Sequence, residues 1–318
     1  MSVLITGGTG FIGSRVARVL LSKDRSVVCL DYAPNAQRFA DLGNESRLAV
    51  VQGDTAHMDD LVAAIREHGI RRIIHLAALL PPVTEDEPRL AMRINVMGAT
   101  NVFEAAARLG VERVVYASSV AVFDDQEYYG DRPVNEDDEV HPYIIYGHTK
   151  VMNEVVGRRY TERFGLDTRA LRPASVFGYG RTTGRSAEVS RIICGAAIDG
   201  KFTSTQSPKQ TSSLIHVDDI VEMFARLCLA DGLERGTYVS GGTTASLEEI
   251  AAMVVKHLPD AEISFPEGVD LYPNLQKSDG SHLARDIKYQ FPDIESRIGE
   301  TIDEARLDNG MTPLSRSS

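Results

Sequence analysis

The chain has 318 residues, of which 43% are hydrophobic and 25% charged, and its formal net charge is -11. This length supports a substantial core without disulfide or metal staples. An acidic chain without a lysine-rich block argues against nucleic acid and membrane surfaces as partners. Three widely spaced cysteines, Cys29, Cys194 and Cys228, lie in apolar runs, so we expect free thiols and a cytoplasmic location.

Short runs of Val, Ile and Leu alternate with helical patterns over the first 175 residues. The predicted strands are 3–5, 26–31, 48–52, 72–76, 113–117 and 168–172, and the predicted helices are 12–22, 58–68, 89–109 and 146–164. Nearly continuous apolar strands are typical of strands buried on both faces. Their alternation with helices predicts βαβ units and an α/β, doubly wound parallel sheet.

The pattern changes after residue 172. Residues 187–198 have a helical pattern, and residues 200–213 are polar and loop-like. A strand at 214–217, a helix at 220–229, a strand at 237–239 and a helix at 246–257 follow, the last with a capping box of Ser246 and Glu249. We predict a domain of residues 1–175, to which segments around 211–240 return. A smaller lobe is formed by residues 176–210 and 241–318.

Two acidic segments, 81–88 and 124–139, follow predicted strands. Charge runs of this kind are usually solvated loops, and that is our expectation here.

A glycine-rich turn stands between the first strand and the first helix. Gly7, Gly10 and Gly13 have the spacing G-x-x-G-x-x-G. Gly7 permits a tight turn, Gly10 lets backbone N–H groups approach a pyrophosphate, and Gly13 lets helix and strand pack closely. This context predicts a dinucleotide site.

The second strand ends in Asp31, 18 residues beyond Gly13. A carboxylate there accepts hydrogen bonds from a ribose diol and repels a 2′-phosphate, so NAD is favoured over NADP. The alternative is an ordinary turn aspartate. Asp54, after the third strand, either meets the adenine amino group or is a plain turn residue.

Tyr146 and Lys150 lie four residues apart at the start of a helical run, so they share one helix face. A fixed ammonium favours the phenolate and lowers the pKa of the phenol toward that of a useful base. Ser118 and Ser119 end the fifth strand, where a substrate oxygen can pair with a hydroxyl; for Ser118 local capping is the favoured interpretation. His216 is expected to be structural, and the histidines lack metal-ligand spacing, so no metal is expected.

This ordered set of motifs resembles the extended short-chain dehydrogenases/reductases, the NAD-dependent epimerase/dehydratase family, over about residues 1–245. The resemblance implies a Rossmann-type domain, NAD and a homodimer that uses the helices at 89–109 and 146–164. It implies that Tyr146 is the general base or acid, that Lys150 binds the nicotinamide ribose and tunes Tyr146, and that Ser119 holds the reacting oxygen. The further cofactor contacts that it implies are Phe11, Ile12, Leu76, Ala77, Ala78, Asn95 and Pro173.

Departures from the family pattern bear on the substrate. Ser212 stands where nucleotide-sugar enzymes commonly have a diphosphate-binding arginine, and Arg181 and Arg185 are the nearby cations. Val120 and Ala121 replace the Asp and Glu of 4,6-dehydratases.

We therefore expect an NAD-dependent oxidoreductase of carbohydrate metabolism. It would transfer hydride between nicotinamide and a secondary alcohol or ketone of a small polar, carbohydrate-like or hydroxy-acid substrate. A nucleotide-sugar 4-epimerase is the first alternative, and a non-enzymatic NAD(H)-sensing regulator is the second.

Overall fold

The computed structural model describes residues 1–314, except for the side chain of Arg185. Within this part of the chain, seven parallel strands form a central sheet in the order β10-β6-β5-β4-β1-β2-β3. The strands are β1 (Ser2–Thr6), β2 (Ser26–Asp31), β3 (Leu48–Gln52), β4 (Ile70–His75), β5 (Arg113–Ala117), β6 (Asp167–Arg172) and β10 (Thr237–Val239). The predicted Rossmann-type, doubly wound sheet is confirmed. Its strand order reverses between β1 and β4, where such sheets bind ligands.

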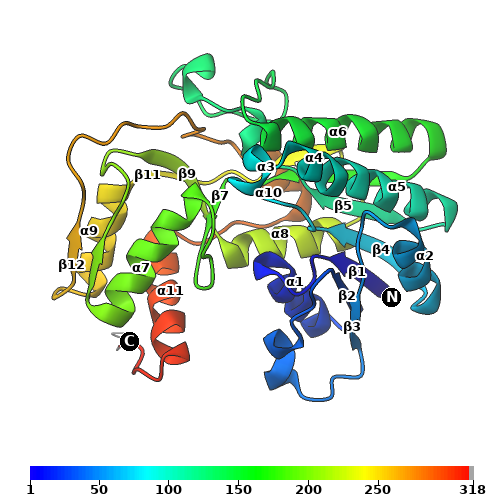
Figure 1. Cartoon of the computed structure of the whole chain (residues 1–318), viewed down its shortest axis with the longest axis horizontal. Coiled ribbons are helices and arrows are strands. Elements are labelled where there is room, and N and C mark those ends of the chain that lie inside the picture. The colour runs from blue at the N-terminus through cyan, green and yellow to red at the C-terminus, as the bar shows by residue number, and fades with distance from the viewer. Residues whose placement is uncertain (315–318) are drawn as a thin grey trace.

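Helices cover both faces of this sheet (Figure 1). On one face, α1 (Phe11–Ser22), α8 (Val217–Leu229) and α10 (Ser281–Ile287) contribute to a core that includes Leu20 and Phe224. On the other face, α2 (Met58–Glu67), α5 (Gly98–Arg108) and α6 (Ile145–Phe164) pack through side chains such as Leu61 and Phe103. The two faces explain why the strands read as uninterrupted apolar runs.

A smaller lobe lies beside the sheet, at the left of Figure 1. Its three-stranded sheet has the order β11-β9-β7, and its core includes Ile192, Ile250 and Ile302. The lobe elements are β7 (Ser175–Phe177), α7 (Glu188–Asp199), β8 (Lys201–Thr203), β9 (Thr211–His216), β11 (Thr243–Ser246), α9 (Leu247–His257), β12 (Glu262–Ser264) and α11 (Ile294–Asp308). The predicted capping box of Ser246 and Glu249 is present at the start of α9.

One local prediction is wrong, and two are confirmed only in part. The polar segment 200–213 was predicted to be a loop but contains β8 and the first residues of β9. The strands that pair with them, β12, β7 and β11, lie far away in sequence, so local composition did not reveal them. The single helix expected over 89–109 is α4 (Pro88–Ala91), a π-helical turn η2 (Met92–Met97) and then α5. The acidic segments hold short helical turns, α3 (Val83–Asp86) and η4 (Gln126–Tyr129).

Hydropathy of the helices bears on membrane insertion. No helix within residues 1–314 combines the length and the apolar character that crossing a bilayer requires.

Candidate active site

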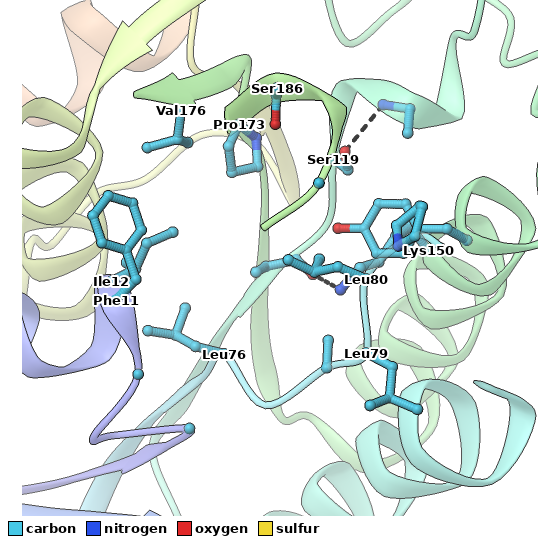
Figure 2. A pocket seen from close by; sticks show the side chains of 18 of the residues that line it. Phe11, Ile12, Leu76, Leu79, Leu80, Ser119, Lys150, Pro173, Val176 and Ser186 are labelled. Atoms are coloured by element: carbon cyan, nitrogen blue, oxygen red, sulfur yellow. Dashed lines mark hydrogen bonds between the residues drawn. The ribbon is translucent and has the colours of Figure 1, made fainter. Parts of the chain in front are cut away.

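A cavity of about 1470 Å³ opens over the carboxyl ends of β1, β2, β4 and β5. Among the described residues, every predicted site residue except Asn95 contributes to its wall. These lining residues are Gly7, Gly10, Phe11, Ile12, Gly13, Asp31, Asp54, Leu76, Ala77, Ala78, Ser119, Tyr146, Lys150 and Pro173. Figure 2 shows Phe11, Ile12 and Leu76 on one side of this space and Ser119 and Lys150 across from them.

The glycine-rich turn is closed to side chains. Gly7 has φ +68°, and a Cβ there would lie 2.9 Å from the backbone nitrogen of Ala77. A Cβ on Gly13 would lie 2.2 Å from the carbonyl oxygen of Gly7. Only glycine fits these positions. The loop leads into the N-terminus of α1, and without side chains its backbone N–H groups can approach a pyrophosphate.

Two carboxylates stand at the far end of the cavity. Asp31 Oδ2 accepts hydrogen bonds from the backbone N–H and the hydroxyl of Thr9, at 3.1 and 2.8 Å. Asp54 is buried, and its Oδ1 accepts from the Ala56 N–H at 2.9 Å. Asp31 is therefore held in place at the end of β2, where the ribose diol of a dinucleotide is expected.

Asn95 supports the cavity from behind. Its side-chain oxygen accepts from the Leu79 N–H at 2.7 Å, and its side-chain nitrogen donates to the Leu79 carbonyl at 3.0 Å. Asn95 lies in the π-helical turn η2, and its own carbonyl accepts from Asn153 Nδ2 at 2.9 Å. This exchange fixes the loop after β4. Asn95 thus supports a loop that lines the cavity, and its predicted contact with the cofactor stays a prediction.

Ser119, Tyr146 and Lys150 meet on the opposite wall. The Ser119 side chain lies close enough to the Tyr146 phenol to lower its pKa, and Ser119 Oγ accepts a hydrogen bond from the Ala121 N–H at 3.1 Å. Lys150 Nζ lies 5.4 Å from the centre of the Tyr146 ring and donates to the Ala117 carbonyl at 2.8 Å. The spacing of four residues thus brings phenol and ammonium together as the sequence predicts.

The electrostatics differ from the sequence-based expectation. Burial raises the pKa of the Tyr146 phenol, and the nearby Ser119 side chain and the charge of Arg181 oppose this rise. Burial lowers the pKa of Lys150 to about 8, against the raising effect of Glu154.

A buried ion pair lies beneath the lysine. Arg172 Nε and Nη2 donate to the two carboxylate oxygens of Glu154 at 2.8 and 2.6 Å. Ser118 donates to the same carboxylate at 2.5 Å, so its predicted role in local capping is wrong. Glu154 lies one helical turn beyond Lys150, which explains why its charge reaches the ammonium.

Glu85, in the acidic segment 81–88, caps the helix that carries Tyr146. Its carboxylate accepts from the N–H groups of Ile145 and Tyr146 at 2.9 and 3.1 Å. Sequence analysis treated this segment as solvated and missed the contact. One signal was present: α6 follows Ile144, which has no side-chain acceptor, so its first N–H groups need an acceptor from elsewhere.

Arg181 lines the cavity and donates to the Ser186 hydroxyl at 2.9 Å. The side chain of Arg185 lies outside the described part of the structure. Ser212, at the position of the missing arginine, is buried and accepts a hydrogen bond from Asn274 Nδ2 at 2.6 Å.

His216 caps α8 by accepting from the Asp218 N–H at 3.3 Å, which agrees with its expected structural role. His216, Asp218 and Glu300 bring three possible metal ligands within 4.8 Å of one another. Arg15 and Arg297 already pair with the two carboxylates, at 3.0 and 2.5 Å, and so supply the positive charge that a metal would bring.

Comparison with known proteins identifies the family and supports the fold. The model of the NAD dependent epimerase/dehydratase family matches residues 3–241. A UDP-glucose 4-epimerase of Mycolicibacterium smegmatis is 31% identical, over 79% of this chain and 80% of its own length. A 3 beta-hydroxysteroid dehydrogenase/Delta 5-->4-isomerase of Mycobacterium tuberculosis is 33% identical, but the match spans 57% of this chain and about half, 48%, of that protein. The crystal structure of L-threonine dehydrogenase from Phytophthora infestans superposes with a TM-score of 0.86 at 25% identity, covering 98% of this chain and 100% of that one.

Proposed function

The chain belongs to the NAD dependent epimerase/dehydratase family and is an NAD-dependent enzyme of the extended short-chain dehydrogenase type, and we propose that it is a dehydrogenase of a small polar alcohol. The substrate would be carbohydrate-like or a hydroxy acid with a secondary hydroxyl. The observation that carries this proposal is the meeting of Ser119, Tyr146 and Lys150 in the same cavity as the glycine-rich turn.

Each of the three side chains has a distinct task in this proposal. Ser119 donates to the substrate oxygen and holds it next to the phenol. Tyr146 takes the hydroxyl proton as the alcohol becomes a ketone, and gives it back in the reverse direction. Lys150, whose pKa is about 8, supplies a positive charge near the phenol and a donor for the cofactor ribose. Bound NAD would supply the acceptor for the hydride of the carbinol carbon.

A nucleotide-sugar 4-epimerase is the second candidate, because the Mycolicibacterium smegmatis relative carries that activity in its name. We favour the dehydrogenase because Ser212, bonded to Asn274, offers a diphosphate neither the charge nor the fork of an arginine. Net NADH release separates the two: a dehydrogenase produces NADH, whereas an epimerase regenerates NAD within each turnover. A regulator that only senses NAD(H) would have no use for a Ser-Tyr-Lys constellation.

We also propose a division of labour along the chain. Residues 1–175, with α8 and β10 from the segment around 211–240, would hold the cofactor, because β10 completes the central sheet and α8 covers its face, whereas β9 pairs with β7 and β11 in the smaller lobe. Residues 176–210 and 241–318 would form the substrate lobe, of which the last four lie outside the described residues.

A homodimer through α6 and the neighbouring helical turn η2 is part of the proposal. Val102 and Ala106 of α5 are buried against the sheet and are therefore not available to such an interface. Other apolar side chains on these helices are exposed and favour a dimer interface there. Met92 and Met97 of η2 are 49% and 53% exposed, and Met152 of α6 is 45% exposed. A second copy would cover them.

We further propose a cytoplasmic location and a role in carbohydrate metabolism. The three cysteines are free in the structure, and two of them, Cys29 and Cys228, are buried. This fits a reducing compartment.

The test is NADH production, followed at 340 nm, with a panel of sugars, sugar acids, polyols and nucleotide sugars. Tyr146→Phe should reduce turnover by on the order of 10²–10⁴, the range for loss of a general acid or base, with NAD affinity little changed. Tyr160→Phe is the matched control, because Tyr160 lies on the same helix with its hydroxyl bonded to Glu104. More than half of wild-type activity in Tyr146→Phe would show that the proposed proton path is wrong.

A further inference from the structure

Arg181 is a cavity residue whose charge has no carboxylate partner among the described residues. Its Nη2 donates to the neutral hydroxyl of Ser186, and its Nε is buried without a hydrogen-bond partner. Its guanidinium carbon lies 6.0 Å from the centre of the Phe11 ring. A partly buried guanidinium with an unpartnered Nε is stabilised when an anion pairs with it.

Other arginines of low exposure in this chain show the usual solution. Arg113, Arg172 and Arg297 have side chains 9%, 6% and 12% exposed, and each pairs with an aspartate or glutamate. Arg181 has no such carboxylate partner among the described residues, and it lines the cavity, where a ligand can reach it. Its anion is therefore expected to come from a bound molecule.

The position of Arg181 narrows the identity of that anion. The residue follows β7 and faces the loop after β4: a Cβ built on Gly184 would lie 3.7 Å from Arg181 Nη2 and 3.9 Å from the Pro81 carbonyl oxygen. Arg181 and Tyr146 also act on each other electrostatically, because the charge of Arg181 lowers the pKa of the phenol. Arg181 and Tyr146 both line the cavity, so one bound molecule has access to the guanidinium and to the proposed reacting group.

We propose that Arg181 binds a carboxylate of the substrate, so that the substrate is a hydroxy acid and not a neutral polyol. This inference rests on the proposed dehydrogenase function and specifies its substrate class. A carboxylate matches the planar fork of arginine in two-point pairing. The second source of such an anion is the pyrophosphate of NAD itself, for which the glycine-rich turn and the N-terminus of α1 already provide donors.

The experiment compares acids with neutral partners of the same carbon skeleton on the NADH-loaded enzyme. The probes are gluconate against sorbitol, 3-hydroxybutyrate against its methyl ester, and L-threonine against its amide, titrated calorimetrically. We expect at least one acid to bind tenfold or more tightly than its neutral partner, and Arg181→Gln to remove that preference. NAD affinity should stay within twofold, and Arg181→Lys should keep part of the preference. Arg66→Gln, which removes an exposed charge from α2, should keep all of it.

Several outcomes would overturn the inference. If no acid is preferred by the unmutated enzyme, Arg181 does not select a carboxylate, and this measurement decides the matter even where Arg181→Gln does not fold. If Arg181→Gln weakens NAD binding tenfold and leaves the acid preference intact, the anion is the pyrophosphate. If neutral alcohols yield NADH as well as acids do, this inference fails and the dehydrogenase stands. Interconversion of a nucleotide sugar without NADH release would instead overturn the dehydrogenase itself.

Discussion

Replacing Glu154 by glutamine tests the ion pair beneath the candidate site. Its carboxylate receives two donors from Arg172, and the Arg172 and Glu154 side chains are only 6% and 11% exposed. An amide keeps the shape but leaves a buried guanidinium without its counter-charge. Removing one partner of a buried pair costs about 3–5 kcal/mol, whereas an exposed pair contributes about 0.2–1 kcal/mol. We therefore expect Glu154→Gln to lower the free energy of unfolding by about 3–5 kcal/mol.

Urea unfolding at pH 7, followed by far-ultraviolet circular dichroism, measures this change. Glu162→Gln is the matched control, because Glu162 lies on the same helix and pairs with Arg159 where the two side chains are 51% and 77% exposed. The control should change stability by less than about 1 kcal/mol. Equal, small effects of the two substitutions would refute the reasoning. Replacing Arg172 by methionine in the Glu154→Gln background should recover part of the loss, since no unpaired charge then remains.

Further predictions concern the cofactor, the lysine and the assembly. Asp31→Ala should narrow a preference for NAD over NADP that we expect to be at least about tenfold, measured by competition titration; equal affinities in the unmutated protein would show that Asp31 does not face the ribose. Gly13→Ala should abolish NAD binding in the same titration, because the new Cβ would lie 2.2 Å from the Gly7 carbonyl oxygen, and retained binding would mean that the turn is free to shift. Burial lowers the pKa of Lys150 from 10.5 to about 8, so between these values the unfolded chain holds a proton that the folded chain lacks, and the free energy of unfolding should rise with pH. Lys150→Met should remove that rise in urea titrations at pH 8 and pH 10. Met97→Asp should convert a sedimenting dimer into a monomer, and a monomer before the substitution would end the dimer proposal.

The sequence predicted those features that local patterns encode. The strands β1 to β6 were accessible because burial on both faces demands continuous Val, Ile and Leu. The glycine-rich turn and the pair Tyr146 and Lys150 were accessible because their geometry follows from spacing within one element. These features are sufficient to predict the central sheet, the class of cofactor and the residues that surround the Tyr146 phenol.

The features that were missed depend on contacts between distant segments. Glu85 reaches the start of α6 across 60 residues, and Arg172 meets Glu154 across 18. The strands β8 and β9 exist because of partners elsewhere in the chain, so their own polar composition does not reveal them. The pKa of Tyr146 depends on burial and on Arg181, which no spacing rule connects to it.

The late position of α8 and β10 in the sequence has a consequence for how the protein folds during synthesis. Residues 1–175 supply six of the seven strands described for this sheet, but α8, which contacts β4 and β5, begins only at residue 217. A nascent chain that has reached residue 200 therefore still exposes the apolar face that Ile220 and Phe224 later cover. Such exposure invites aggregation or chaperone binding. We expect the two lobes to mature together, and a fragment that ends at residue 175 to be insoluble although it contains the whole glycine-rich turn and all three side chains of the proposed proton path.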